Sequence, residues 1–145
     1  MASVHDVAAY LTMRFGALGT MKLEKLVYYC QGWWLARNDS PLFPEQLEAW
    51  HMGPVCPDLY TQHRRQNFVD SWMWGDAQKL TDQQKQHVDA VFDVYGAYSG
   101  FHLGNMTHQE KPWNAAKARG GYNPVIEVND MREYFTELDG QSSSG

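Results

Sequence analysis

The residue pattern with the clearest chemical potential is His108-Gln-Glu110, in which an imidazole and a carboxylate are two positions apart. It matches the His-x-Glu half of the zinc deaminase signature. The other half requires Pro-Cys-x-x-Cys, whereas Val55-Cys56-Pro57-Asp58 supplies one cysteine. Structural and catalytic zinc sites need three or four protein ligands. We therefore expect no metal and no cofactor, and a small hydrolase-type enzyme using His108 and Glu110 is the weaker alternative.

Other catalytic motifs are also missing from the sequence. There is no Gly-x-Ser-x-Gly segment, and Cys30 falls in the middle of an expected helix, where nothing would activate its thiol. Gly16-Ala-Leu-Gly19 lacks the Lys-Ser/Thr that completes a phosphate loop. Asp89 and Asp93 lie one helical turn apart, and we interpret them as a solvated helix face. The prediction is a protein that is not an enzyme and has no catalytic residues.

Charge and hydropathy exclude further classes of function. The chain of 145 residues carries 12 Lys and Arg against 17 Asp and Glu, a net charge of −5. This charge argues against a nucleic-acid-binding domain, because such domains are usually basic. An acidic surface instead suits a basic protein partner. No apolar run approaches the ~20 residues of a membrane span, and the first residues do not form a secretory signal. We expect a cytoplasmic location, with Cys30 and Cys56 reduced and buried.

Aromatic content is the unusual feature, at 14% with six tryptophans. Aromatic and polar residues occur together in two segments, and two interpretations stay open for them. They form a polar network that fixes how a hairpin meets the helices, or they are contact residues for a protein partner. The residues concerned on either interpretation are Glu48, Trp50, His51, Gly53, Pro54, Thr107, His108, Glu110, Pro112 and Trp113.

Helices must position these segments, because apolar residues recur at three- and four-residue spacing through most of the chain. Helices are expected at residues 4–15, 20–37, 57–65, 82–98, 109–119 and 129–138, with a turn or short helix at 101–106. The apolar arc of 20–37 is broader than one core face requires, which predicts the central helix. The expected N-caps are Ser3, Thr81 (with Gln84 completing a capping box), Thr107 and Asn129. Pro112 restricts the helix after Thr107 to a start near Lys111.

Two short segments, residues 47–52 and 68–74, alternate at period two and are expected to pair as a small two-stranded β-hairpin. The fold class is thus mainly α, a single compact helical domain with a minor β-hairpin. Residues 1–139 form this domain. The Gly-Gln-Ser-Ser-Ser-Gly segment at 140–145 is expected to be a disordered tail.

These segments, in this order, resemble the Panacea-domain antitoxin family, which includes phage-associated GepA-like proteins. The resemblance runs from Val7 to Leu138 and rests on the motifs Lys22-Leu-Glu-Lys-Leu-Val-Tyr28-Tyr-Cys-Gln-Gly32-Trp33, Pro41-Leu-Phe43, Glu48 to Tyr60, Leu80-Thr81, Val91 to Gly96 and Thr107 to Trp113.

The resemblance implies a mostly helical antitoxin of a type II-like toxin–antitoxin pair, often found in prophages and linked to phage defence. Such a protein neutralises a co-encoded toxin by direct protein–protein binding. The alternative that the family implies is a proteolytic adaptor, which delivers a toxin or other client to a cytosolic protease. The family provides no catalytic residue to transfer. Two departures are His51, where the family usually has a more basic residue, and the lack of an appended helix-turn-helix, which argues against autoregulation through DNA.

Overall fold

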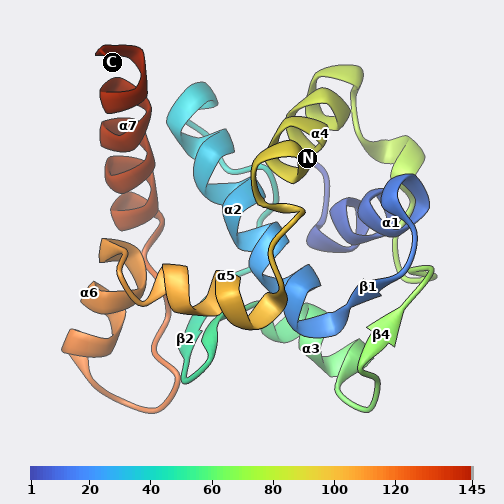
Figure 1. Cartoon of the computed structure of the whole chain (residues 1–145), viewed down its shortest axis with the longest axis horizontal. Coiled ribbons are helices and arrows are strands. Elements are labelled where there is room, and N and C mark those ends of the chain that lie inside the picture. Colours follow the sequence, from blue (N-terminus) through green and yellow to red (C-terminus); the bar gives the residue numbers. More distant parts are fainter. Residues whose placement is uncertain (145) are drawn as a thin grey trace.

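The computed structural model describes residues 1–144, and side chains up to Gln141. Helices dominate this part of the chain, as predicted, and the β structure is limited to two small two-stranded sheets. The centre is α2 (Thr20–Asn38), which contacts most other helices. Figure 1 shows α6 (Lys111–Arg119) and α7 (Val128–Ser144) on one side of α2, and α1 (Val4–Phe15) and α4 (Asp82–Tyr95) on the other.

The prediction that residues 20–37 form the central helix is confirmed, because α2 is buried around most of its circumference. Every residue from Leu23 to Gly32 is buried, a run that passes more than twice around the helix. Gly32 allows α7 to approach closely, since a Cβ at this position would lie 2.2 Å from Cε2 of Phe135. The Phe135 ring meets the Tyr29 ring edge to face. The broad apolar arc therefore serves contacts on several sides at once.

Local capping signals in the sequence are confirmed at two helices. The Ser3 hydroxyl accepts from the Asp6 N–H while the Asp6 carboxylate accepts from the Ser3 N–H, so α1 begins with a capping box. Thr81 and Gln84 make the same reciprocal pair at α4. Pro57 is the first residue of α3 (Pro57–His63), where its missing N–H has no cost.

Other predicted boundaries are wrong. Thr107 does not cap α6: it is the last residue of α5 (Gly100–Thr107), and its hydroxyl donates to the Gly104 carbonyl oxygen at 2.6 Å. Residues 108–109 form a turn, and Glu110 holds the N-cap position of α6. Asn129 lies inside α7, which begins one residue earlier. Helix α4 ends at Tyr95 rather than near Tyr98, and η1 (Ala77–Lys79) is a short 3-10 helix before it.

The predicted pairing of residues 47–52 with 68–74 is also wrong. Strand β2 (Glu48–Trp50) pairs antiparallel with β3 (Gly53–Val55), and β4 (Phe68–Val69) pairs with β1 (Leu18–Gly19). Gly53 has φ +118°, a conformation that L side chains rarely adopt, and this lets the chain reverse directly after His51-Met52. The local hairpin replaces the longer-range pairing, and it closes a far shorter loop.

Helix α7 continues to Ser144, beyond the predicted end of the domain at residue 139, and residue 145 lies outside the described part of the chain. The division into a domain and a tail stays a prediction. Cys30 and Cys56 are buried free thiols, as predicted, and burial raises the pKa of Cys56 to about 12. Within residues 1–144, no helix has the length and apolarity needed to cross a bilayer.

Candidate functional site

The structure brings the two aromatic and polar segments of the sequence together, where the β2–β3 hairpin meets the end of α5 and the start of α6. The Trp113 Nε1–H donates to the carbonyl oxygen of Trp50 at 2.9 Å. The Trp50 Nε1–H donates to Glu48 Oε1 at 2.8 Å, so both indoles, each half-buried, have partners within the chain. His108 Nε2 lies 3.0 Å from the carbonyl oxygen of His51. We call this region the hairpin–helix joint; it comprises Glu48, Trp50, His51, Gly53, Pro54, Thr107, His108, Glu110, Pro112 and Trp113.

Small residues allow the backbones in this joint to touch. A Cβ on Gly104 would lie 2.4 Å from the Met52 carbonyl oxygen, and a Cβ on Gly53 would lie 3.0 Å from Thr107 Oγ1. Pro54 of the hairpin and Pro112 of α6 are both buried. The tip of the hairpin is therefore seated directly on the α5 backbone, with no space for a larger side chain at Gly104.

Glu110 connects the joint to the central helix. Its carboxylate is buried and accepts from the Tyr28 hydroxyl at 3.0 Å and from the Tyr29 hydroxyl at 2.8 Å. Burial raises the pKa of Glu110 to about 7, while the two tyrosine hydrogen bonds act in the opposite direction. Each of the two carboxylate oxygens thus accepts a hydrogen bond from a tyrosine of α2, which gives this acid a structural role.

His108 and Glu110 engage different parts of the molecule. The His108 ring packs on the Trp113 ring, with centroids 4.3 Å apart, and its Nε2 faces the hairpin backbone, whereas Glu110 faces the tyrosines of α2. In the described residues, no group of three or more His, Cys, Asp and Glu is arranged to hold a metal ion. Asp89 accepts from the Tyr10 hydroxyl at 2.8 Å, and Asp93 is exposed.

A second buried polar cluster was not anticipated from the sequence. Glu24 lies 2.6 Å from His63 Nε2 through one carboxylate oxygen and accepts from the Cys56 N–H at 2.8 Å through the other. Burial raises the pKa of Glu24, and its bonds to His63 and to the Cys56 amide oppose that effect. The signal in the sequence was the charged pair Glu24-Lys25 between the apolar residues Leu23 and Leu26, in a helix predicted to be buried.

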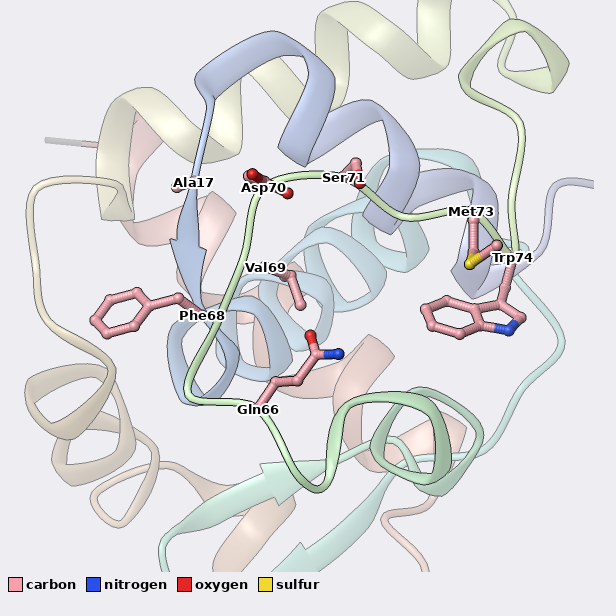
Figure 2. A pocket seen from close by; sticks show the side chains of 8 residues that line it. All are labelled: Ala17, Gln66, Phe68, Val69, Asp70, Ser71, Met73 and Trp74. Carbon is pink, nitrogen blue, oxygen red and sulfur yellow. The ribbon is translucent and has the colours of Figure 1, made fainter.

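A group of exposed apolar side chains was also missed. Phe68 is 71% exposed, Phe101 61% and Met73 82%. Met21 and Trp74, exposed to 36% and 43%, border hollows that Phe68 also borders. We call these five residues the Phe68 face. Figure 2 shows the hollow on one side of β4, where Gln66 and Val69 point into the curve of the chain and Phe68 points away from it.

Phe68 separates two hollows of this face. The hollow in Figure 2 has a volume of about 380 Å³ and is bordered by Met73 and Trp74. The other has a volume of about 470 Å³ and lies between β1 and the start of α5, bordered by Met21 and Phe101. Large apolar side chains that gather at the surface are typical of protein-binding sites.

Comparison with known proteins gives one family. No curated protein and no solved structure matches the chain significantly. The family described as "Antitoxin SocA-like, Panacea domain" matches residues 23–114, a range that includes the whole hairpin–helix joint and most of the Phe68 face. This range covers more than half of the chain and agrees with the resemblance that the sequence motifs indicated. The chain therefore belongs to the family of SocA-like antitoxins with a Panacea domain.

Proposed function

We propose that this chain is the antitoxin of a type II-like toxin–antitoxin pair and that it neutralises a co-encoded toxin by binding it directly, without catalysis. Membership of the SocA-like family supports a general antitoxin role. Direct binding requires a surface on which a partner can bury apolar area, and the Phe68 face is the region of the chain that best provides one.

The observation that carries the proposal is the exposure of large apolar side chains on one face. Phe68 and Phe101 leave most of their surface in contact with water in the free protein. Burying apolar surface contributes roughly 25 cal/mol per Å², and aromatic residues dominate the energetics of protein interfaces. We assign the toxin-binding contacts to Phe68, Phe101 and the neighbouring side chains of the Phe68 face.

The hairpin–helix joint has a different part in this proposal. The indole N–H groups of Trp50 and Trp113 already donate within the chain, and Glu110 is buried against α2. We therefore assign the joint residues to the fold. Because the joint seats the hairpin on Gly104 of α5, it fixes the helix that carries Phe101. The motif residues thus act on binding through the position of α5.

Growth of cells that express the neighbouring reading frame tests the proposal. Expression of that frame alone should arrest growth, and co-expression of this chain should restore it. Phe68→Asp should abolish the rescue, because it places a carboxylate where apolar surface must be buried. Tyr122→Ala is the matched control: Tyr122 is an aromatic residue with 95% exposure that borders neither hollow of the face. This variant should rescue as the wild type does.

Two further readouts complete the experiment. Co-purification of the two proteins should be lost with Phe68→Asp and kept with Tyr122→Ala, while both variants keep the wild-type circular dichroism. The amount of toxin distinguishes sequestration from the adaptor alternative, since an adaptor for a cytosolic protease would shorten the lifetime of the toxin. A neighbouring frame without toxicity, or full rescue by soluble Phe68→Asp, would contradict the proposal.

A further inference from the structure

A third hollow, with a volume of about 340 Å³, lies between the start of α2, the β2–β3 hairpin and α3. Trp50, Val55 and Tyr60 provide apolar walls, and the Trp50 and Tyr60 rings meet edge to face with centroids 4.8 Å apart. This volume is at the lower end of the range for small-molecule sites. We call it the Lys25 pocket, after the buried lysine among its lining residues.

Lys25 is the unusual feature of this pocket. Only 1% of its surface is exposed, although its side chain carries an ammonium group. Among the described residues, no hydrogen-bond acceptor and no ion-pair partner is in contact with this ammonium. The stem of Lys25 runs beneath the hairpin, since a Cβ on Gly53 would lie 2.9 Å from Lys25 Cε. Within the described residues, Arg132 Nε is the one buried side-chain nitrogen or oxygen without a hydrogen-bond partner. The Lys25 ammonium therefore keeps contact with water, and it does so beside an open hollow.

The neighbouring carboxylate of Glu24 does not serve as this partner. One of its oxygens accepts from the Cys56 N–H and the other is in contact with His63 Nε2. Its negative charge does act on Lys25 at longer range: burial lowers the pKa of Lys25 to about 8, and the charge of Glu24 partly offsets this effect. Lys25 is therefore mostly protonated at neutral pH, and its ammonium stays available to a bound anion.

We propose that the Lys25 pocket binds a small organic carboxylate with an apolar or aromatic body. The carboxylate would accept a charge-assisted hydrogen bond from the Lys25 ammonium, and the body would lie between Trp50, Val55 and Tyr60. Such a carboxylate occurs on free aromatic acids and at the C-terminal residue of a polypeptide. This inference does not depend on the antitoxin proposal, because it rests on a pocket outside the Phe68 face apart from the shared border residue Met21.

The first test is titration of the full chain with 3-phenylpropionate, followed by NMR, with the neutral isostere 3-phenylpropanamide as the control ligand. The carboxylate should bind at least tenfold more tightly than the amide. Lys25→Met keeps the length of the stem without its charge and should remove this preference. Lys111→Met alters an exposed lysine of α6 and should leave it unchanged. Equal affinities for acid and amide, or no binding of the acid at millimolar concentration, would overturn the proposal.

Retention of the fold in Lys25→Met is checked by circular dichroism. If the variant does not fold, the pH dependence of binding by the wild type decides the matter. The affinity for 3-phenylpropionate should fall by about tenfold between pH 7 and pH 9 as Lys25 loses its proton. The other titratable or charged groups lining the pocket are Glu24 of α2, His51 of the hairpin, and Tyr60, His63 and Arg64 of α3. Constant affinity over this range would overturn the role of Lys25.

A second arm distinguishes the two sources of carboxylate. Acetyl-Gly-Phe with a free C-terminus is compared with the same dipeptide as its amide. Tighter binding by the free dipeptide than by 3-phenylpropionate assigns the pocket to polypeptide C-termini. Tighter binding by 3-phenylpropionate than by the dipeptide assigns the pocket to small molecules. If neither carboxylate is preferred over its amide, the proposal is wrong for both sources.

Discussion

The hairpin–helix joint contacts both α2 and α5, and the Phe68 face includes Met21 of α2 and Phe101 of α5, yet their aromatic residues are used in opposite ways. In the joint, the indole N–H groups of Trp50 and Trp113 donate within the chain, and backbones approach so closely that Gly104 tolerates no Cβ. On the Phe68 face, Phe68 and Phe101 are mostly exposed. Aromatic content alone therefore does not identify a binding surface. The two regions differ in whether their aromatic side chains already make contacts within the chain or are exposed to water.

This difference separates residues that maintain the fold from residues that are free to bind. Substitutions in the joint remove contacts that the folded chain makes and the unfolded chain lacks, so they should lower the free energy of unfolding. Substitutions on the Phe68 face remove few such contacts. If that face binds a partner, they should lower affinity at nearly constant stability.

The largest expected effects are those of Trp113→Ala and Phe68→Ala, which should act on different quantities. Trp113→Ala should lower the free energy of unfolding, and Phe68→Ala should lower toxin affinity. Trp113→Ala removes a half-buried indole and its hydrogen bond to Trp50, and should lower the free energy of unfolding by about 3 kcal/mol, the lower end of the range for such truncations. Phe68→Ala should change stability by less than about 0.5 kcal/mol. In toxin binding Phe68→Ala should cost about 2 kcal/mol or more. Urea denaturation and calorimetric titration measure the two quantities.

Controls for this pair come from the same chain. Tyr122→Ala should be neutral in both measurements, because Tyr122 is almost fully exposed and lies outside both regions. The comparison fails if Phe68→Ala destabilises the fold as strongly as Trp113→Ala does. It also fails if Trp113→Ala weakens toxin binding while leaving the free energy of unfolding unchanged.

The second prediction concerns pH and involves only the joint. The folded-state pKa of Glu110 is about 7, raised by burial from 4.5. Between these two values the folded protein holds a proton that the unfolded chain has released. The stability contributed by this group is complete below pH 4.5 and is lost as the pH rises through 7. Between pH 5 and pH 7 the loss should be on the order of 2 kcal/mol.

Comparison with Glu110→Gln isolates this effect, because the amide does not ionise. The free energy of unfolding of the variant minus that of the wild type should increase by the same amount over this pH range. Phe68→Ala should keep the wild-type pH dependence, since Phe68 lies outside the joint. Parallel curves for the wild type and Glu110→Gln, measured by urea denaturation from pH 5 to pH 8, would contradict the predicted pKa of Glu110.

Local signals in the sequence predicted two of the four expected N-caps correctly. Ser3 and Thr81 cap their helices because the reciprocal partners Asp6 and Gln84 are three residues away. The central position of α2 followed from its broad apolar arc. The strand pairing was not predictable in the same way, because alternation indicates a strand without naming its partner. The reversal at Gly53 depends on a backbone conformation that the sequence pattern does not reveal.

For the candidate site too, local motifs could be predicted from the sequence and long-range contacts could not. Ordered motifs marked the hairpin–helix joint, although they did not reveal which hydrogen bonds connect it. The exposure of Phe68 depends on the pairing of β4 with β1, which are separated in the sequence by residues 20–67. No local pattern therefore indicates it. Glu24 and Lys25 gave a usable signal, since charged residues inside a predicted buried helix require a partner or a ligand.

The smallest expected effect tests a single hydrogen bond of the joint. Trp113→Phe removes the Nε1–H that donates to the Trp50 carbonyl oxygen but keeps an aromatic ring beside His108. The loss should be about 1 kcal/mol, typical of a hydrogen bond in a folded protein, and smaller than that of Trp113→Ala because most of the ring packing remains. Toxin affinity should change little, because the hairpin stays seated on α5 and Phe101 keeps its position. If Trp113→Phe is as damaging as Trp113→Ala, the hydrogen bond rather than ring packing fixes the hairpin, and the joint acts mainly through its polar contacts.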